Sequence, residues 1–317
     1  MRTSVECRKA PLKSSLKATI LLLLAALVAV GQNLPSDYAG VLKALEKQGD
    51  FKDNVLKIDI PRNDVKVTID GIATPTPFGF GGWLAMTKGA GGDEVMMGDL
   101  VLLEDEVNPI MSALLDSGLE VTALHNHFFF ETPRMFYMHV HGHGTAATLA
   151  KMVKPALDLI GKVSPQHQGS VTGPNSPISA GPIDIAKIAM LVGHSGEQNG
   201  VVYKITIARP DISLTDLGAT INTRMGLNSW AAFFGTDANA ELAGDVAMLA
   251  EEVAPVLKAL RANALDVVAL HNHMIGGQPT VYFLHYWGTG PVEKLARGFK
   301  AALDETGKGR AATDVHH

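Results

Sequence analysis

The chain contains one sequence module written twice, and this repetition limits its fold more than any other feature. The segment VTALHNH (residues 121–127) recurs as VVALHNH (residues 267–273), with six of seven residues identical at an offset of 146. The same offset aligns GDLVLLEDEVNPIMSALL (residues 98–115) with GDVAMLAEEVAPVLKALR (residues 244–261). Similarity over most of each half indicates tandem copies of one structural unit. We therefore predict two homologous domains with the same fold.

The length of 317 residues is sufficient for two domains of ordinary size. We expect repeat 1 to cover residues 36–162 and repeat 2 to cover residues 182–306. Residues 163–181 are rich in Pro, Gly and Ser, which do not build a packed element, and we predict an exposed linker there. Residues 307–317 are expected to form a disordered tail.

The N-terminus has the pattern of an export signal. The apolar run TILLLLAALVAV (residues 19–30) follows five basic residues and is shorter than the about 20 apolar residues that span a bilayer. Small residues, Ala29 and Gly31, precede the expected cut before Gln32. We predict a signal peptide over residues 1–31 and a periplasmic or secreted protein without a stable membrane span. An uncleaved N-terminal anchor is the alternative.

The composition outside this segment restricts the partners and the ligand chemistry. Residues 32–317 contain 22 Lys and Arg against 31 Asp and Glu, a net charge of −9. Nucleic-acid binders carry basic patches, so we expect no nucleic-acid partner. The only cysteine is Cys7, within the predicted signal peptide. The exported protein would therefore have neither disulfides nor thiolate metal ligands.

The hydrophobic pattern of repeat 1 predicts an α+β fold. A helix over residues 36–49 precedes short strands at residues 55–60, 65–69 and 83–87. The rest follows in the order β-α-β-β-α: strand 94–103, helix 104–117, strand 119–128, strand 134–143 and helix 145–162. This order favours a mixed or antiparallel sheet in each repeat, with helices packed on one face.

Five histidines at odd positions carry the functional prediction for repeat 1: His125, His127, His139, His141 and His143. Alternate residues of a strand share one face of the sheet. A hairpin turn centred on Pro133 would place His127 opposite His139, with Cβ atoms about 5 Å apart. It would also place His125 opposite His141, with His143 at the rim. A register different by one residue would separate the two sets onto opposite faces.

Clustered imidazoles without sulfur ligands are typical of sites for a divalent transition metal, and zinc or copper is the expected cofactor. Ni(II) and Fe(II) accept the same ligands. Two alternative roles for these histidines stay open. They could line a polar ligand pocket, or they could form a hydrogen-bonded layer with a structural role.

Carboxylates are predicted close to this site. The helix over residues 104–117 connects two strands that are expected to run in the same direction. Glu104 and Glu106, at the start of this helix, would then lie at the sheet edge where the first histidine strand ends. Glu106 recurs as Glu252, whereas Glu104 aligns with Ala250. Glu106 is therefore the candidate general base. A favourable charge at a helix N-terminus is the alternative role.

The second repeat keeps three of the five histidines: His271, His273 and His285. Trp287 and Thr289 replace His141 and His143. Three imidazoles can still hold a metal ion with one open coordination position. We expect repeat 1 to be the working site and repeat 2 to be a weaker one.

The phrases GDLVLLEDEVNPIM, VTALHNH and PRMFYMHVHGHG, with their counterparts in the second half, resemble the LppY/LpqO family of exported bacterial proteins. The resemblance covers residues 36–162 and 182–306 and implies tandem copies of a domain of unknown function. The family name comes from lipoproteins. Here no cysteine follows the apolar run, so we expect a secreted or periplasmic form without a lipid anchor.

Together these features predict an exported two-repeat protein that binds a transition metal through its histidines. If the protein is an enzyme, metal-assisted hydrolysis with Glu106 as the base is the expected reaction. The alternative is a non-catalytic binding module that takes a small molecule or a protein partner between the repeats. The sequence does not decide between an enzyme and a binding module.

Overall fold

The computed structural model describes residues 33–162 and 181–308, which fall within one compact unit. The predicted signal peptide, residues 1–31, lies outside the described residues, as do residues 163–180 of the predicted linker and residues 309–317 of the predicted tail. Among the helices of the described residues, none has the length and apolar character needed to cross a membrane.

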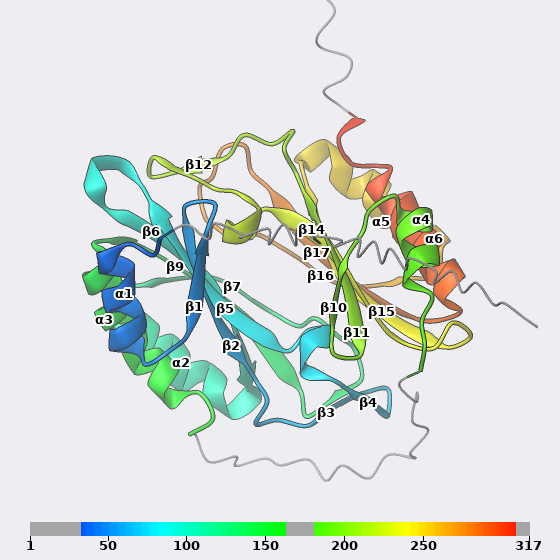
Figure 1. The fold of residues 1–317 in the computed structure, drawn as a ribbon, viewed down its shortest axis with the longest axis horizontal. Helices are drawn as coiled ribbons and strands as arrows, with labels where there is room; N and C mark the ends of the chain where they lie inside the picture. The colour runs from blue at the N-terminus through cyan, green and yellow to red at the C-terminus, as the bar shows by residue number, and fades with distance from the viewer. Residues whose placement is uncertain (1–32, 163–180, 309–317) are drawn as a thin grey trace, which may run out of the picture. The chain divides into compact units, whose positions relative to one another are not determined.

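Each repeat contains a six-stranded antiparallel sheet, and the two sheets share one strand order, β1-β2-β5-β6-β9-β7 and β10-β11-β14-β15-β17-β16 (Figure 1). The strands of repeat 1 are β1 (Gly49–Lys52), β2 (Val55–Pro61), β5 (Gly81–Lys88), β6 (Glu94–Leu103), β7 (Glu120–His125) and β9 (Met135–Gly144). Those of repeat 2 are β10 (Glu197–Asn199), β11 (Val202–Ala208), β14 (Asn228–Gly235), β15 (Ala240–Met248), β16 (Asp266–His271) and β17 (Tyr282–Gly290). The predicted tandem α+β fold is therefore confirmed.

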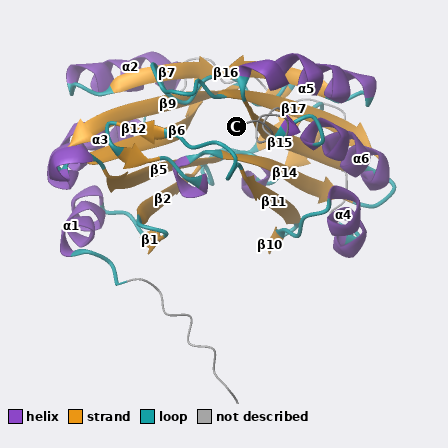
Figure 2. Cartoon of the chain, turned by 90° about the horizontal axis from the view of Figure 1, so that it is seen from above, coloured by secondary structure: helices purple, strands orange, loops and turns teal. Residues whose placement is uncertain are grey.

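Helices cover the outer face of each sheet (Figure 2). Repeat 1 has α1 (Ser36–Leu45), α2 (Glu104–Asp116) and α3 (Ala146–Leu159), and repeat 2 has α4 (Ile185–Val192), α5 (Ala250–Ala262) and α6 (Val292–Leu303). Apolar residues at helical spacing, such as Leu149 and Val153 of α3, pack on Met138 and Val140 of β9. The Thr145 hydroxyl accepts a hydrogen bond from Thr148 N and caps α3.

The central β-α-β-β-α segment is arranged largely as predicted. Strand β9 lies between β6 and β7 and is antiparallel to both, so β6 and β7 run in the same direction without being neighbours. Alternation along β9 then assigns its two faces. The even-numbered Met138 and Val140 face the helices, whereas the odd-numbered Met135 and Tyr137 face the other repeat. The odd-numbered histidines share this inner face.

A segment between the second and third strands of each sheet reaches across to the other repeat. We call residues 62–80 arm 1 and residues 209–227 arm 2. Arm 1 contains β3 (Val67–Ile69), β4 (Ile72–Thr74) and the short helix η1 (Thr76–Phe78), and arm 2 contains β12 (Thr215–Asp216), β13 (Ala219–Thr220) and η3 (Thr223–Met225). Two further short elements are η2 (Ala90–Gly92) and β8 (Glu131–Thr132), which pairs with β3.

The arms interlock the two repeats (Figure 1). Ile69 and Phe78 of arm 1 share an apolar core with Phe234 of repeat 2. Reciprocally, Ile221 of arm 2 shares a core with Met97 of repeat 1. Each arm thus covers the inner face of the other repeat's sheet as well as its own. Residues of both repeats therefore line the space between the two sheets.

Candidate metal centre

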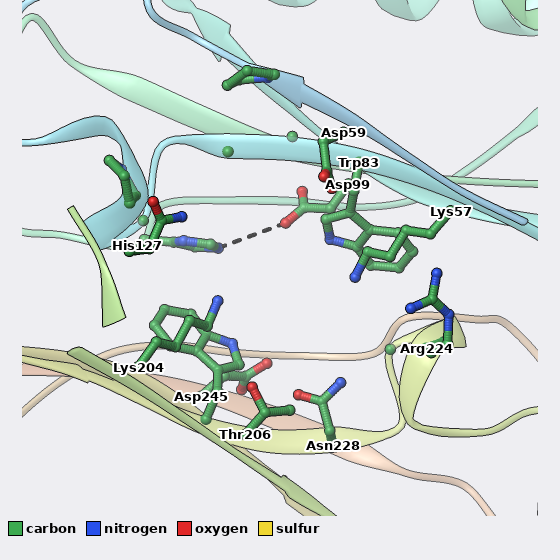
Figure 3. A pocket seen from close by; sticks show the side chains of 18 of the residues that line it. Lys57, Asp59, Trp83, Asp99, His127, Lys204, Thr206, Arg224, Asn228 and Asp245 are labelled. Atoms are coloured by element: carbon green, nitrogen blue, oxygen red, sulfur yellow. Dashed lines mark ion pairs between the residues drawn. The ribbon is translucent and has the colours of Figure 1, made fainter. Parts of the chain in front are cut away.

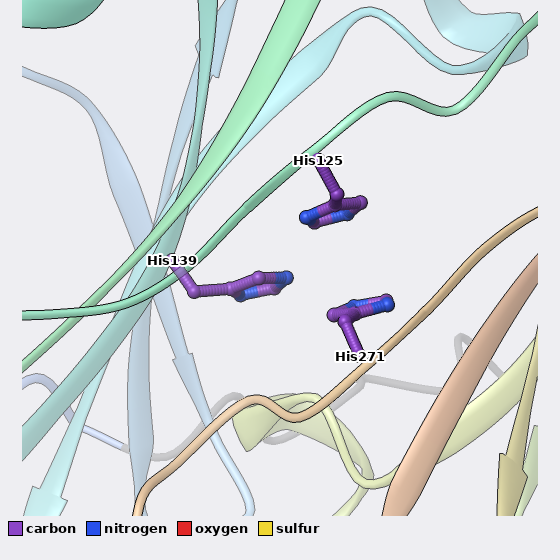
Figure 4. A group of neighbouring side chains, drawn as sticks. All are labelled: His125, His139 and His271. Carbon is purple, nitrogen blue, oxygen red and sulfur yellow. The ribbon is translucent and has the colours of Figure 1, made fainter.

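Six buried or half-buried histidines, three from each repeat, come together between the sheets. We call them the histidine cluster: His125, His127, His139, His271, His273 and His285. The ring centroids of pairs from different repeats lie 3.9 Å apart for His125 and His271, 3.7 Å for His127 and His285, and 4.3 Å for His139 and His273. Figure 4 shows His125, His139 and His271 with their rings directed toward a common region. The structure therefore joins the two predicted sites into one.

Strand ends and aromatic contacts hold these rings in place. His125 and His271 are the last residues of β7 and β16, the edge strands that meet between the repeats. The ring of His127 lies between that of Tyr137, at 3.3 Å, and that of His285 from the other repeat. The equivalent His273 lies against Phe283, at 3.4 Å between centroids. Each of these two imidazoles is thus fixed on one side by its own repeat.

The predicted strand register was wrong. His125 lies opposite Tyr137, and His139 lies opposite Ala123, instead of the predicted pairs. The chain leaves β7 after His125 and does not return in a tight turn, because the connection includes β8, which pairs with arm 1. The shift at His125 is four residues, an even number, so the imidazoles keep a common face. The predicted pairing of the histidines is therefore wrong, but the prediction that they share one face of the sheet is correct.

His141 and His143 do not join the cluster. His141 Nδ1 lies 2.9 Å from Oε2 of Glu120, and its Nε2 lies 2.7 Å from Oδ2 of Asp216 in arm 2. Both ring nitrogens are therefore already occupied. His143 is exposed near the end of β9. The expected square of four imidazoles in repeat 1 is accordingly not formed.

The contact of His141 with arm 2 predicts a pH-dependent contribution to stability. Burial lowers the pKa of His141, but Asp216 and Glu120 outweigh burial and raise it above its ordinary value of 6.5. The stabilisation is then fully present below pH 6.5 and is lost as the pH rises through the folded-state pKa. We expect His141→Gln to lower the free energy of unfolding by about 1–3 kcal/mol near pH 5.5 and by less near pH 8.5.

Urea unfolding of wild type and His141→Gln across this range measures the difference. His143→Gln is the matched control, because His143 lies on the same strand and is exposed. It should change the free energy of unfolding by less than about 0.5 kcal/mol at each pH. A difference between wild type and His141→Gln that grows with pH would contradict the assigned ion pairs.

Glu106 is not placed as a general base. Its Oε2 accepts hydrogen bonds from Arg62 Nη1 at 2.6 Å and Leu103 N at 2.7 Å, and its Oε1 accepts from Gly161 N at 2.7 Å. Glu252 is paired in the same way with Arg209. The sequence placed Glu106 at the correct helix N-terminus, but the carboxylate joins the helix cap and a buried arginine rather than the histidines. The alternative structural role fits this arrangement.

Two buried aspartates lie next to the cluster, and they were not predicted as site residues from the sequence. Asp99 of β6 lies opposite His139, and Asp245 of β15 lies opposite His285. Asp99 Oδ2 is 3.9 Å from His127 Nε2, and Asp245 Oδ2 is 4.0 Å from Nε2 of its own repeat's His273. Their signal was present in the repeat alignment, because Asp99 and Asp245 align at the 146-residue offset within the otherwise apolar runs 96–103 and 242–249.

Many polar atoms of the site have no hydrogen-bond partner among the described residues. They are both ring nitrogens of His125, His127 and His271, Nε2 of His139, and Oδ1 of Asp99 and Asp245. Most buried polar side-chain atoms in proteins are hydrogen-bonded, and an unpaired one costs about 1–3 kcal/mol. Such a concentration at one place is typical of a site that binds a ligand or an ion.

The electrostatics keep the imidazoles neutral at neutral pH. Burial lowers the pKa of all six, assisted for most of them by neighbouring imidazoles, and it brings His139 and His285 to about 3. His285 Nδ1 donates to the Gly244 carbonyl at 3.3 Å, and His139 makes the equivalent bond with the Gly98 backbone. Such a bond holds the proton on Nδ1 and leaves the Nε2 lone pair for coordination.

Three combinations of these residues bring their donor atoms within 4.8 Å of one another. They are His125, His139 and His271; His125, His127 and His285; and Asp245, His271 and His273. Each combination has the imidazole or carboxylate donors that zinc and copper accept. Two of the three contain histidines from both repeats. These buried groups could therefore hold a metal ion.

A cavity of ≈ 690 Å³ lies beside the cluster (Figure 3). Its buried part is lined by His127, His139, His273, His285, Asp99 and Asp245. Asp59 and Thr206 are exposed, and they mark its mouth. A volume of this size is typical of sites for small molecules.

Comparison with known proteins finds a match between the chain and the model of one protein family. The model of a family described as Domain of Unknown Function (DUF1259) matches the chain twice, at residues 39–159 and 186–305. The double match confirms tandem copies of a domain of unknown function, whereas the LppY/LpqO name stays a prediction. No curated protein matches the chain. The crystal structure of a trimeric bacterial microcompartment shell protein, PduB, matches with 10% identity over 80% of this chain and 88% of that one, but a TM-score of 0.19 supports no argument.

Proposed function

The chain belongs to the DUF1259 family, and we propose that its two family domains together bind a divalent transition metal, zinc or copper, through the histidine cluster. One observation carries the proposal: buried imidazole nitrogens from both repeats lie within coordination reach of one another and have no hydrogen-bond partner among the described residues. Neutral imidazoles are the form that coordinates a metal.

The donor set favours these metals over others. Three imidazoles, or two imidazoles with a carboxylate, suit Zn(II) and Cu(II), whereas Ca(II) and Mg(II) require oxygen ligands. The described residues contain no cysteine, so no thiolate competes for the metal. The backbone bonds of His139 and His285 would orient these two rings for coordination through Nε2.

The reaction that we propose for this centre is metal-assisted hydrolysis. A bound zinc ion would lower the pKa of a water molecule and polarise the bond to be broken. In this reaction Asp99 and Asp245, rather than Glu106, would accept the proton of that water molecule, because both aspartates line the cavity. Burial raises the pKa of Asp245 to about 7, which is suitable for proton exchange near neutral pH.

A non-catalytic binding module is the second candidate. The cavity between the repeats favours it, because a site of ≈ 690 Å³ accommodates a small molecule whether or not a reaction follows. Export to the periplasm or the medium is proposed on the signal-like residues 1–31 alone.

Elemental analysis of the purified protein tests the proposed centre. We expect a stoichiometric content of zinc or copper, and a lower melting temperature after treatment with a chelator. A metal at 1,000 times its dissociation constant would stabilise the fold by about 4 kcal/mol. Protein that is isolated metal-free, takes up neither ion and melts at the same temperature with and without chelator would refute the proposal.

A further inference from the structure

The cavity contains a second feature that metal binding does not explain. Two lysine–tryptophan pairs, one from each repeat, line it. Figure 3 labels Lys57, Trp83 and Lys204 of these pairs. Lys57 Nζ of β2 lies 4.9 Å from the ring centroid of Trp83, and Lys204 Nζ of β11 lies 4.2 Å from that of Trp230. The pairs are equivalent in the two repeats, so the walls of the cavity carry the same groups.

Within the described part of the chain, neither lysine has an anionic partner within contact distance. Among residues 33–162 and 181–308, no salt bridge or side-chain hydrogen bond involves Lys57 or Lys204, whereas the third cation of the cavity, Arg224, is paired with Asp50 at 2.6 Å. Both lysines are half-buried. Asp59 and Asp245 act on these charges only from beyond contact distance, so two half-buried cations beside one cavity are costly unless an anion lies between them.

The electrostatics agree with this geometry. Burial, assisted by the positive charge of Lys57, lowers the pKa of Lys204 to about 8, against the opposing effect of Asp245 and Asp59. Burial also lowers the pKa of Lys57; the Asp59 and Asp50 carboxylates oppose this shift, whereas the positive charge of Arg224 adds to it. A bound anion would reverse these shifts and would be held by charge-assisted hydrogen bonds.

The two indoles indicate the rest of the ligand. Trp83 and Trp230 are half-buried and line the cavity, and flat rings bind well against such surfaces. Asn228 and Thr206 add neutral polar groups near the mouth (Figure 3). The volume admits a small molecule and excludes a folded macromolecule.

We propose that this cavity binds a small organic anion whose carboxylate or phosphate group lies between Lys57 and Lys204 and whose flat ring lies against Trp83 and Trp230. The ligand would then lie beside the histidine cluster. The idea that this ligand is the substrate of the metal centre rests on the proposed function. The lysine–tryptophan site itself is formed without a metal.

Titration of the full chain with three matched probes tests the inference. The probes are benzoate, phenyl phosphate and the neutral benzamide, followed by calorimetry and by quenching of tryptophan fluorescence. We expect benzoate or phenyl phosphate to bind and benzamide to bind at least about tenfold more weakly. Whichever anion binds more tightly identifies the charged group.

Two double variants locate the binding. Lys57→Ala/Lys204→Ala should weaken binding of the anion by about tenfold or more. Lys151→Ala/Lys258→Ala removes the same charge from exposed positions on α3 and α5 and should bind like wild type. Equal binding of benzamide, unchanged affinity in the first variant, or no binding of either anion at millimolar concentration would overturn the proposal.

Repeating the titration with chelated protein separates the two proposals. Lysine-dependent binding that survives in protein that never takes up zinc or copper would support the anion site and refute the metal centre. Stoichiometric metal together with lysine-independent binding would support the metal centre and refute the anion site.

Discussion

A variant with His125→Ala and His271→Ala is expected to lose zinc or copper completely while keeping its fold. Each of the three combinations of donors that lie within 4.8 Å of one another contains at least one of these two residues. Their rings stack at 3.9 Å, where the repeats meet. The change should reduce the metal content of the purified protein from stoichiometric to background. It should also make the melting temperature insensitive to chelator.

His143→Ala/His194→Ala is the matched control, because it removes two exposed imidazoles and leaves the cluster intact. It should retain the wild-type metal content. The single variant His125→Ala distinguishes a shared centre from two separate ones. Separate sites would keep about half of the metal, whereas a shared centre loses more than half. Full metal content in the double variant would contradict the assigned ligands.

Arg62→Met is expected to lower the free energy of unfolding by about 3–5 kcal/mol, because it leaves the buried carboxylate of Glu106 without its charged partner. Both side chains of this ion pair are 1% exposed, and their nearest atoms lie 2.6 Å apart. Arg209→Met should have a similar effect in repeat 2, where Arg209 pairs with Glu252. Urea denaturation measures both.

Arg297→Met is the control for this prediction. Arg297 is 62% exposed and pairs with Glu293 one helical turn away, and such surface pairs contribute less than about 1 kcal/mol. Metal content should be unchanged in all three variants. If Glu106→Gln abolished a hydrolytic activity while leaving stability intact, the structural role assigned to this ion pair would be wrong.

Local patterns predicted the elements of each repeat well. Alternation of apolar residues, helical spacing and the repeat offset identified β6, α2, β7, β9 and α3 in order. Three of the predicted histidines are retained in both repeats, and in repeat 1 they are His125, His127 and His139. These retained histidines are the ones that the structure brings together. These properties depend on neighbours in sequence, and for that reason the sequence alone reveals them.

The remaining features depend on contacts between distant segments. The register of β7 on β9 is set by β8 and arm 1, so spacing around Pro133 could not give it. One of the two partners of His141 is Asp216, 75 residues away in the other repeat. Likewise, no local pattern separates a glutamate that reaches a histidine from one that, like Glu106, turns back to an arginine.

The exchange of arms has a consequence for how such a chain could arise. A lone copy of the module would lack the arm that the other copy contributes to its inner sheet face and would hold only three of the six imidazoles. Two such copies, paired as the repeats are here, would complete the cluster, with His125 and its equivalent stacked where the copies meet. Joining two such copies in one polypeptide would let each half diverge outside the cluster, as Trp287 in place of His141 illustrates.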